Sequence, residues 1–257
     1  MKLVVLGSGP AVPHARRSSA AFWLECESGT MMLDLSASAP LRMAQEGLDW
    51  GSLDAVWLSH FHLDHCCGLP AFLFGTRNAP ETRERTKPLK IFGPVGTQRL
   101  IENFDQVNGY KLFKQHFPIE ITEVEPLEHF EIMPGLSAIA HKTLHTPESL
   151  AIRIEDAGSR SLVYTSDTGF AKELAAFGER ADLFVTESSY FKDKPVDKHL
   201  ELAEAMYLIG RAKPKRAMIT HFYAEWDEVD FAKEVGRFDP GCEVIEAVDG
   251  LRLDLSE

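Results

Sequence analysis

The sequence predicts a layered α/β fold, and two recurring patterns support this prediction. Short apolar runs bounded by turn residues, such as Leu53–Ser59 and Arg216–Thr220, are typical of buried strands. Amphipathic stretches lie between such runs, and Val196–Arg211 is the longest of them; they are typical of helices that place one face against a sheet. A chain that combines both kinds of segment buries its apolar faces by stacking helices on sheets.

The expected elements follow from these patterns in chain order. Strands are expected at Val4–Leu6, Leu53–Ser59, Leu136–Leu144, Ser161–Thr165 and Arg216–Thr220. Helices are expected at His65–Phe74, Val95–Asn103, Lys172–Phe177, Val196–Arg211 and Asp227–Gly236. Pro214 follows the fourth helix, where a proline is a common stop signal.

Length and composition fit one folded domain. The chain has 257 residues, of which 44% are apolar, so a single α/β domain covering residues 1–257 can bury a large core. There is no run of eighteen apolar residues, which predicts that no transmembrane helix is present. The apolar start of the chain stops at the turn Gly7–Pro10, which is too early for a signal peptide. We therefore expect a cytoplasmic protein without a membrane partner.

The most specific pattern in the chain is the stretch His60–His65, with the sequence HFHLDH, directly after a predicted strand. Imidazole nitrogens and carboxylate oxygens are the ligands that Zn²⁺-class ions take in proteins. His60 and His62 are two residues apart, so an extended loop can turn both toward one ion. Asp64 and His65 can then face a second ion. So many ligands in one short loop favour two metal ions.

Further residues of metal-binding type follow predicted strands downstream. They are His145, Asp167 and His221, each placed after one of the apolar runs given above. Side chains at the same ends of neighbouring strands converge in layered α/β folds. One histidine after a strand is weak evidence for a metal site. Four strands that each end just before such a residue are strong evidence for one. The sequence therefore predicts one shared centre.

These residues together resemble the H-x-H-x-D-H signature and ligand set of the metallo-β-lactamase superfamily. The resemblance implies a four-layer αββα sandwich, and it implies how the ligands divide between two metals. The first metal would be bound by His60, His62 and His145, the second by Asp64, His65 and His221, and both would be bridged by Asp167. Asp34 would orient the histidine loop by contacting the ligands without binding a metal itself. Flavin-dependent di-iron relatives carry Glu in place of His62, so this histidine favours a hydrolytic site.

A narrower resemblance is to the ribonuclease Z-like branch of the superfamily. The segments that carry it are Val4–Pro10, Pro13, Arg17–Ser19, Ile91–Gly96, Glu187–Tyr190, Lys198–Leu200 and Thr220–Phe222. In that branch a histidine at the position of His199, backed by an acidic residue at the position of Glu187, resembles a proton donor to the leaving oxygen. The catalytic residues implied are Asp64, His199 and Glu187, with His199 at the start of the fourth helix.

Two features depart from ribonuclease Z itself. The long arm that binds tRNA would be inserted between His145 and Asp167, but Asp167 follows His145 by only 22 positions. The chain also has 27 Lys and Arg against 39 Asp and Glu, and its net charge of −12 opposes nucleic-acid binding at long range. RNA is therefore a disfavoured partner. The alternative is a homodimer in which basic loops of the two copies together bind RNA.

The expected activity is that of a metal-dependent hydrolase with two Zn²⁺ ions, or with Mn²⁺ as the alternative metal. A hydroxide between the metals would attack a small anionic substrate, namely a phosphodiester, a cyclic phosphate or a nucleotide. The first alternative is a ribonuclease Z-like tRNA 3′-end endonuclease. Further alternatives are a hydrolase of esters, sulfates or lactones, and a non-catalytic metal-binding protein.

The most polar stretch of the chain is Thr76–Lys90, which contains Arg77, Arg83, Arg85 and Lys87. We interpret it as a solvated loop. The alternative is a mobile lid beside the metals that contacts the anionic substrate.

Overall fold

The computed structural model describes residues 1–256, which contain two seven-stranded β-sheets. In spatial order, the first sheet consists of β14 (Arg252–Asp254), β1 (Lys2–Gly7), β2 (Ala21–Cys26), β3 (Gly29–Leu33), β4 (Ala55–Trp57), β5 (Leu89–Pro94) and β6 (Ile119–Val124). The second consists of β13 (Glu243–Glu246), β12 (Arg216–Thr220), β11 (Leu183–Glu187), β10 (Ser161–Tyr164), β9 (Leu150–Asp156), β8 (Leu136–Lys142) and β7 (His129–Met133).

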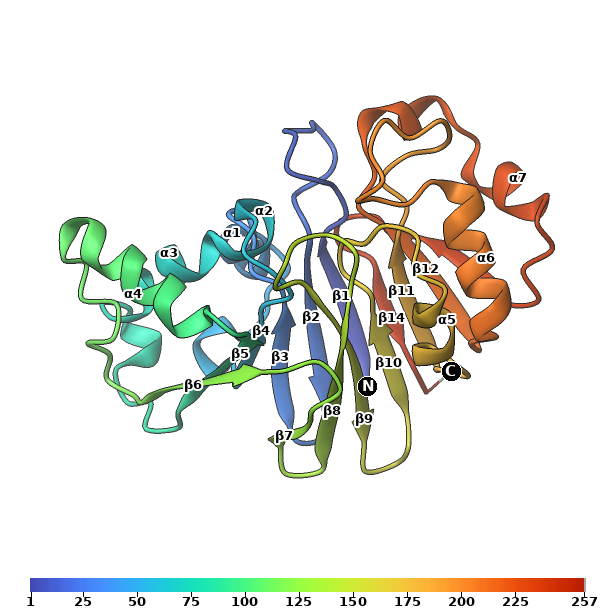
Figure 1. Ribbon diagram of the computed structural model, residues 1–257. Helices are drawn as coiled ribbons and strands as arrows, with labels where there is room; N and C mark the ends of the chain where they lie inside the picture. The colour runs from blue at the N-terminus through green and yellow to red at the C-terminus, as the bar shows by residue number, and fades with distance from the viewer. Residues whose placement is uncertain (257) are drawn as a thin grey trace.

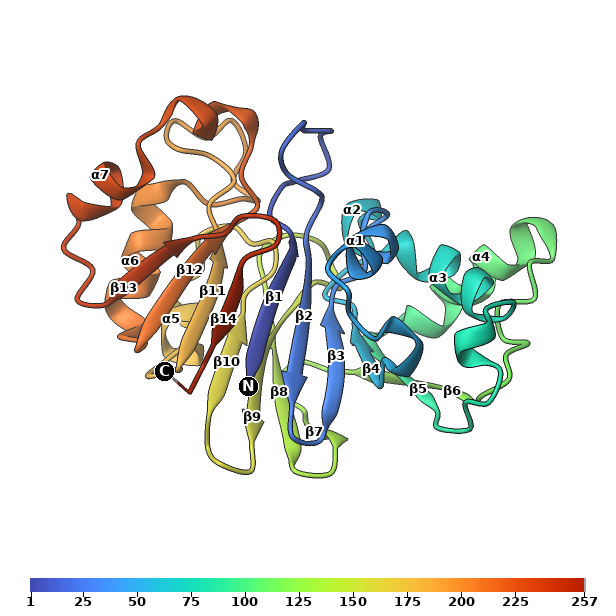
Figure 2. The same cartoon turned by 180° about the vertical axis from the view of Figure 1, so that it is seen from behind.

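Helices cover the outer face of each sheet. The first sheet carries α1 (Ala39–Gln45), α2 (Leu63–Cys66), α3 (Gly68–Thr76) and α4 (Thr97–Asn108), and the second carries α5 (Glu173–Phe177), α6 (Leu202–Ala212) and α7 (Phe231–Gly236). Three short 3-10 helices complete the set: η1 (Trp50–Ser52), η2 (Pro80–Thr82) and η3 (Ala224–Glu228). The helices of the two groups lie on opposite sides of the paired sheets (Figure 1), and the view from behind shows the same layers (Figure 2). The expected αββα sandwich is confirmed.

Strand β1 shows why the core has more than one layer. Leu3 and Val5 pack in the cluster between the two sheets, whereas Val4 and Leu6 pack in the cluster beneath the helices of the first sheet. Successive side chains of a strand point to opposite faces, so a strand that is apolar throughout is stable only when both faces are covered.

The loops that the sequence singles out start from one edge of the sandwich. Strands β3, β4 and β5 run parallel, as do β10, β11 and β12, and β8 shares the direction of β10 because both are antiparallel to β9. Backbone hydrogen bonds join the two sheets at this edge: the Leu150 amide donates to the Ser59 carbonyl (2.9 Å), and the Phe222 amide donates to the Ser8 carbonyl (3.0 Å). The loops after β4, β8, β10 and β12 therefore meet.

Two of the expected helices are divided in the structure. The expected helix His65–Phe74 consists of α2 and α3, separated at Cys67, and the expected helix Asp227–Gly236 consists of the end of η3 followed by α7. Helix α4 extends to Asn108, beyond the expected end at Asn103. Among residues 1–256, no helix combines the length and apolar character needed to cross a membrane.

The expected start of the helix Val196–Arg211 was wrong. Helix α6 begins at Leu202, because Glu201 and Glu204 form a capping box in which each side chain accepts a hydrogen bond from the other residue's backbone amide. His199 consequently lies in the loop before α6, and not at a helix start.

The segment Thr76–Lys90 is anchored to the body of the protein. The Arg85 guanidinium donates hydrogen bonds to the backbone carbonyls of Gly51 and Leu53 outside the segment, and to two carbonyls within it, those of Lys87 and Pro88. The buried hydroxyl of Thr82 donates to the carbonyl of Thr76. These contacts favour an ordered loop over a mobile lid.

Candidate metal centre

The loop after β4 turns directly into α2. His60 is fully buried, and His62 is the N-cap of the helix, with an extended backbone (φ −65°, ψ 145°). Helix α2 begins at Leu63 and so places Asp64 and His65 in its first turn. The change from extended to helical backbone within six residues gives one short loop two sets of metal-binding side chains.

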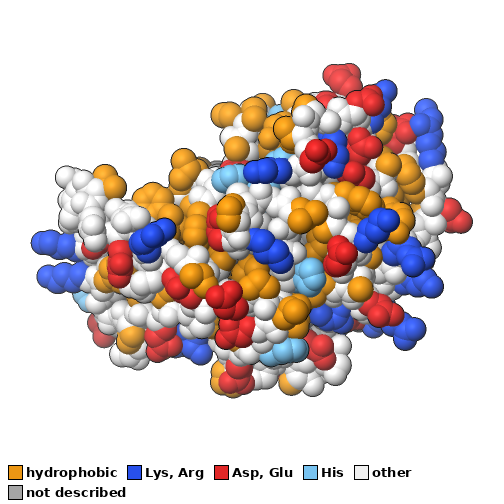
Figure 3. Space-filling model, viewed as in Figure 1, with side chains coloured by type: hydrophobic (Ala, Val, Ile, Leu, Met, Phe, Trp, Pro, Cys, Tyr) orange, Lys and Arg blue, Asp and Glu red, His pale blue; other side chains and the backbone are white. Residues whose placement is uncertain are grey.

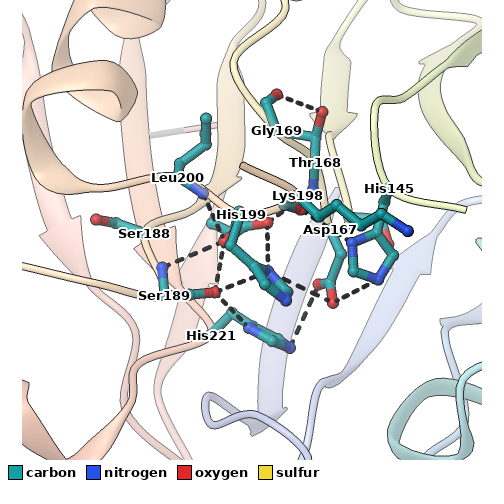
Figure 4. Close-up of polar contacts among 12 residues, drawn as sticks. His145, Asp167, Thr168, Gly169, Ser188, Ser189, Lys198, His199, Leu200 and His221 are labelled. Carbon is teal, nitrogen blue, oxygen red and sulfur yellow. Dashed lines mark hydrogen bonds and ion pairs between the residues drawn. The ribbon is translucent and has the colours of Figure 1, made fainter. Parts of the chain in front are cut away.

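The structure brings the seven expected ligands together in two groups that share one carboxylate. The groups are His60, His62, His145 and Asp167, and Asp64, His65, His221 and Asp167, with the ligand atoms of each group within 4.8 Å of one another. The shared Asp167 is buried, with Oδ2 3.4 Å from His65 Nε2 and Oδ1 3.3 Å from His221 Nε2. Figure 4 shows this carboxylate between His145 and His221.

Three buried ring nitrogens of this centre have no hydrogen-bond partner within residues 1–256. They are the Nε2 atoms of His60, His65 and His221, and each lies within 4.0 Å of an Asp167 carboxylate oxygen. A buried polar atom without a partner costs about 1–3 kcal/mol, and such atoms are rare in folded proteins. A divalent cation takes up the lone pairs of these nitrogens, so the residues present fit a bound metal.

Asp34, directly after β3, fixes two of these imidazoles. Its Oδ2 accepts hydrogen bonds from His65 Nδ1 (2.7 Å), Ser59 Oγ (2.8 Å) and Tyr164 Oη (2.8 Å), and its Oδ1 accepts one from the Ser59 amide (2.7 Å). Ser59 Oγ also lies 3.0 Å from His60 Nδ1. Because an ionised carboxylate only accepts, His65 carries a proton on Nδ1 and can direct the lone pair of Nε2 toward a metal.

Three residues of this centre have a left-handed backbone conformation. Asp34, Ser166 and His221 have positive φ angles of 58°, 55° and 65°, which are uncommon for residues other than glycine. Gly169 permits a close approach that any side chain would prevent, since an added Cβ would lie 2.1 Å from the Asp197 carbonyl oxygen. That approach packs the loop containing His199 against the turn containing Asp167.

His199 lies beside both groups and contacts a carboxylate from β11. Its Nδ1 is 3.0 Å from Glu187 Oε1 and 4.0 Å from Asp167 Oδ2. Glu187 is buried and also accepts hydrogen bonds from the amides of Thr168 (2.7 Å) and Leu200 (3.2 Å). Burial lowers the pKa of His199, but the charge of Glu187 and the hydrogen bond to it outweigh burial and raise the pKa to about 9. This histidine therefore holds its second proton at neutral pH.

Three polar residues of the site were not anticipated from the sequence. Ser59 and Ser189 lie close in sequence to His60 and Glu187, and a hydroxyl next to a candidate ligand is a weak signal that could have identified them. Tyr164 lies within an apolar strand, and nothing in its local sequence indicates that its hydroxyl reaches Asp34 in the other sheet.

An αββα sandwich with a buried His/Asp centre at one edge defines a metal-dependent hydrolase. The chain belongs to the β-lactamase superfamily: the family model "Beta-lactamase superfamily domain" matches residues 31–222. A ribonuclease Z from Nitrosopumilus maritimus is 27% identical over 307 aligned residues, which cover 99% of this chain and 100% of that protein.

Solved structures show the same fold. The metallo-β-lactamase-fold protein YhfI from Bacillus subtilis has a TM-score of 0.80 at 23% identity and covers 98% of both chains. The short form of human tRNase Z has a TM-score of 0.79 at 20% identity and covers 99% of both chains. The fold and the His/Asp cluster imply binding of a divalent metal, for which zinc is typical.

Proposed function

We propose that this hydrolase is a two-metal phosphodiesterase acting on small phosphodiesters, cyclic phosphates or nucleotides. The observation that carries the proposal is His199, held by Glu187 and 4.0 Å from the shared Asp167. An alkoxide leaving from a phosphodiester is strongly basic and needs a proton, and a histidine in this position can supply one. Hydrolysis of lactams or thioesters has less need of such a group.

The metal-binding roles follow the two groups of side chains. One ion would be held by His60, His62 and His145, the other by Asp64, His65 and His221, and Asp167 would contact both. When bound, two Zn²⁺ or Mn²⁺ ions would acidify water and neutralise negative charge on the phosphoryl group.

Residues of the chain orient the metal ligands and supply the proton. Asp34 keeps His65 oriented directly and His60 through Ser59. Glu187 accepts the Nδ1 proton of His199, so the proton available for transfer is the one on Nε2. That proton passes to the leaving oxygen as its bond to phosphorus breaks, and the neutral imidazole keeps its hydrogen bond to Glu187.

Substrate size is inferred from the hairpin between β9 and β10 and from the net charge. The hairpin lies between the expected ligands His145 and Asp167, and its turn consists only of residues 157–160. It is too short to form an arm that grips a folded RNA. The net charge of −12 also repels a polyanion at long range.

The proposal is tested by measuring kcat/KM for bis-(p-nitrophenyl) phosphate, cyclic nucleotides and a precursor tRNA, using protein of known metal content. We expect turnover of the small diesters and weak or no cleavage of the tRNA. A protein that binds two ions and hydrolyses esters or lactones but no phosphodiester would overturn the proposal.

A second candidate function is RNA cleavage, and the distribution of charge favours it. Residues 76–116, here called the basic lobe, contain eight Lys and Arg against four Asp and Glu, so the lobe carries +4 while the rest of the chain carries −16. Within residues 1–256, Lys87 is the one cation of the lobe that forms an ion pair, with Asp54. Figure 3 shows Lys and Arg side chains at the end of the molecule where α4 lies in Figure 1. Arg85 is held by backbone carbonyls, but Arg83, Arg99, Lys111 and Lys114 are exposed, and such cations on a projecting lobe suit contacts with phosphates.

Efficient, position-specific cleavage of precursor tRNA at physiological salt would favour this second function. The assay is done on the native oligomer, because a dimer that brings two basic lobes together increases the positive surface available to RNA.

A further inference from the structure

Ser189 lies just beyond the end of β11, between two histidines with different proposed roles. Its Oγ is 2.5 Å from Glu187 Oε2, 2.8 Å from His221 Nδ1 and 3.1 Å from His199 Nδ1. The residue is fully buried, so no solvent competes for these contacts. Figure 4 shows the contacts that run from this hydroxyl to both rings.

The number of hydrogens determines the direction of each bond. A serine hydroxyl has one hydrogen to donate, and an ionised carboxylate can only accept. The 2.5 Å separation of two oxygen atoms requires a hydrogen between them, so the hydroxyl donates to Glu187. Toward both imidazoles the Ser189 oxygen can therefore only accept.

This direction defines the tautomer of His221. The ring must carry a proton on Nδ1 to donate to Ser189, which leaves a lone pair on Nε2 when the ring is neutral. That Nε2 has no hydrogen-bond partner among the described residues, and it lies 3.3 Å from Asp167 Oδ1 and 3.5 Å from Asp64 Oδ2. It points into the second group of proposed ligands.

We propose that Ser189 is a positioning residue for metal binding: it accepts the Nδ1 proton of His221 and thereby keeps the Nε2 lone pair directed at the second metal position. The proposal rests on the metal-binding role proposed for His221. It extends that role by linking the second metal position to Glu187, the carboxylate that also holds His199.

The same arrangement occurs once more in the molecule. Ser59 Oγ donates to Asp34 Oδ2 (2.8 Å) and lies 3.0 Å from His60 Nδ1, so a carboxylate, a serine and a histidine are again connected in series. The two series serve different proposed metal positions. Loss of Ser189 should therefore affect the second ion and spare the first.

The test is a zinc titration of the Ser189→Ala variant against a competing chelator, with Ser188→Ala as the matched control. Ser188 is equally buried, but its hydroxyl donates to the Tyr190 carbonyl and does not contact the centre. We expect the second Zn²⁺ to bind about 10–100-fold more weakly in Ser189→Ala, as is typical when the partner of a ligand is removed. The first Zn²⁺ should bind as in the wild type, and the control should bind both ions normally.

A second readout is the imidazole ¹H–¹⁵N NMR spectrum of the zinc-loaded protein. Wild type and Ser188→Ala should show a protected Nδ1–H signal for His221, and Ser189→Ala should lose it or show rapid exchange. Unchanged affinity for the second ion in a folded Ser189→Ala variant would overturn the inference. Equal weakening of both ions would also overturn it, because that result indicates general destabilisation.

Neither readout uses a substrate. A protein that shows these metal and NMR effects but cleaves no phosphodiester would refute the proposed function and leave the role of Ser189 intact.

Discussion

Each half of the molecule, meaning one sheet with the helices that cover it, contains a buried carboxylate at the same edge of the sandwich. The two carboxylates accept hydrogen bonds from different partners. Asp34, beyond β3 of the first sheet, accepts hydrogen bonds from Ser59, His65 and Tyr164. Glu187, at the end of β11 of the second sheet, binds Ser189 and His199 and also accepts from backbone amides. Both reach a proposed metal ligand through a serine.

The difference lies in what else each carboxylate holds. Asp34 accepts a hydrogen bond directly from the proposed ligand His65. It also accepts one from Tyr164 of the other sheet, so Asp34 joins the two sheets at the metal centre. Glu187 contacts His199, which is outside the proposed ligand set, and its amide partners come from loops of its own half. In the proposed function, Asp34 thus supports metal binding, whereas Glu187 supports both a metal ligand and the proton donor.

The largest effect is expected for Asp34→Asn. An amide cannot accept from four donors, and each buried group left unpaired costs about 1–3 kcal/mol. Both proposed ions should bind at least about 10–100-fold more weakly, because His60 and His65 lose orientation together. Zinc titration and thermal unfolding measure the two effects.

Asp54→Asn is the control, since Asp54 is buried but contacts Lys87 and Thr30 far from the centre. Loss of one ion only would contradict the role assigned to Asp34.

His199→Ala should separate proton donation from metal binding. The variant should retain both ions, and its turnover of alkyl or nucleotide diesters should fall about 10²–10⁴-fold. Turnover of p-nitrophenyl diesters should stay nearly normal, because nitrophenoxide leaves without a proton. Steady-state kinetics on both substrate types provide the measurement, and His129→Ala, at an exposed position on β7, is the control. Equal loss on both substrates would show that His199 does not donate a proton.

Glu187→Gln should shift the pH dependence of the reaction. With a pKa of about 9, His199 carries its acidic proton below that pH and loses it as the pH rises through 9. Without the charge of Glu187 the pKa falls, so the rate on alkyl diesters should decline at a lower pH. The measurement is a pH profile of kcat at saturating zinc. An unchanged alkaline limb would mean that another group controls it.

The smallest effect is expected for the basic lobe, which belongs to the first half. Arg99→Gln combined with Lys111→Gln should weaken RNA binding a few-fold and reduce its dependence on log[salt] by about 0.7–0.9 for each phosphate that the protein no longer neutralises. Filter binding over a range of salt concentrations measures both. The double variant Lys172→Gln and Arg211→Gln removes two exposed cations from the second half as a control. The same weakening in both double variants would show that RNA binds the surface without preference for the lobe.

Local patterns in the sequence were sufficient to predict the fold class and the set of residues that converge. The stretch His60–His65 is informative by itself because its ligand types and the strand before it are both local. The runs ending before His145, Asp167 and His221 are informative for the same reason, since a buried strand needs continuous apolar residues. The strand Arg216–Thr220 was predicted with its observed bounds.

The tertiary structure alone decided how these residues are oriented. The sequence predicted His199 on a helix, but α6 begins only at Leu202, and the loop that contains His199 packs against the distant Gly169 through the Asp197 carbonyl. The hydrogen bond from Tyr164 to Asp34 joins residues 130 positions apart, and no local pattern encodes such a contact. The roles of Ser59 and Ser189 depend on which partner takes their single hydrogen. That choice is fixed only when two neighbouring strands of one sheet, β3 and β4 for Ser59 or β11 and β12 for Ser189, bring a carboxylate and an imidazole to one hydroxyl.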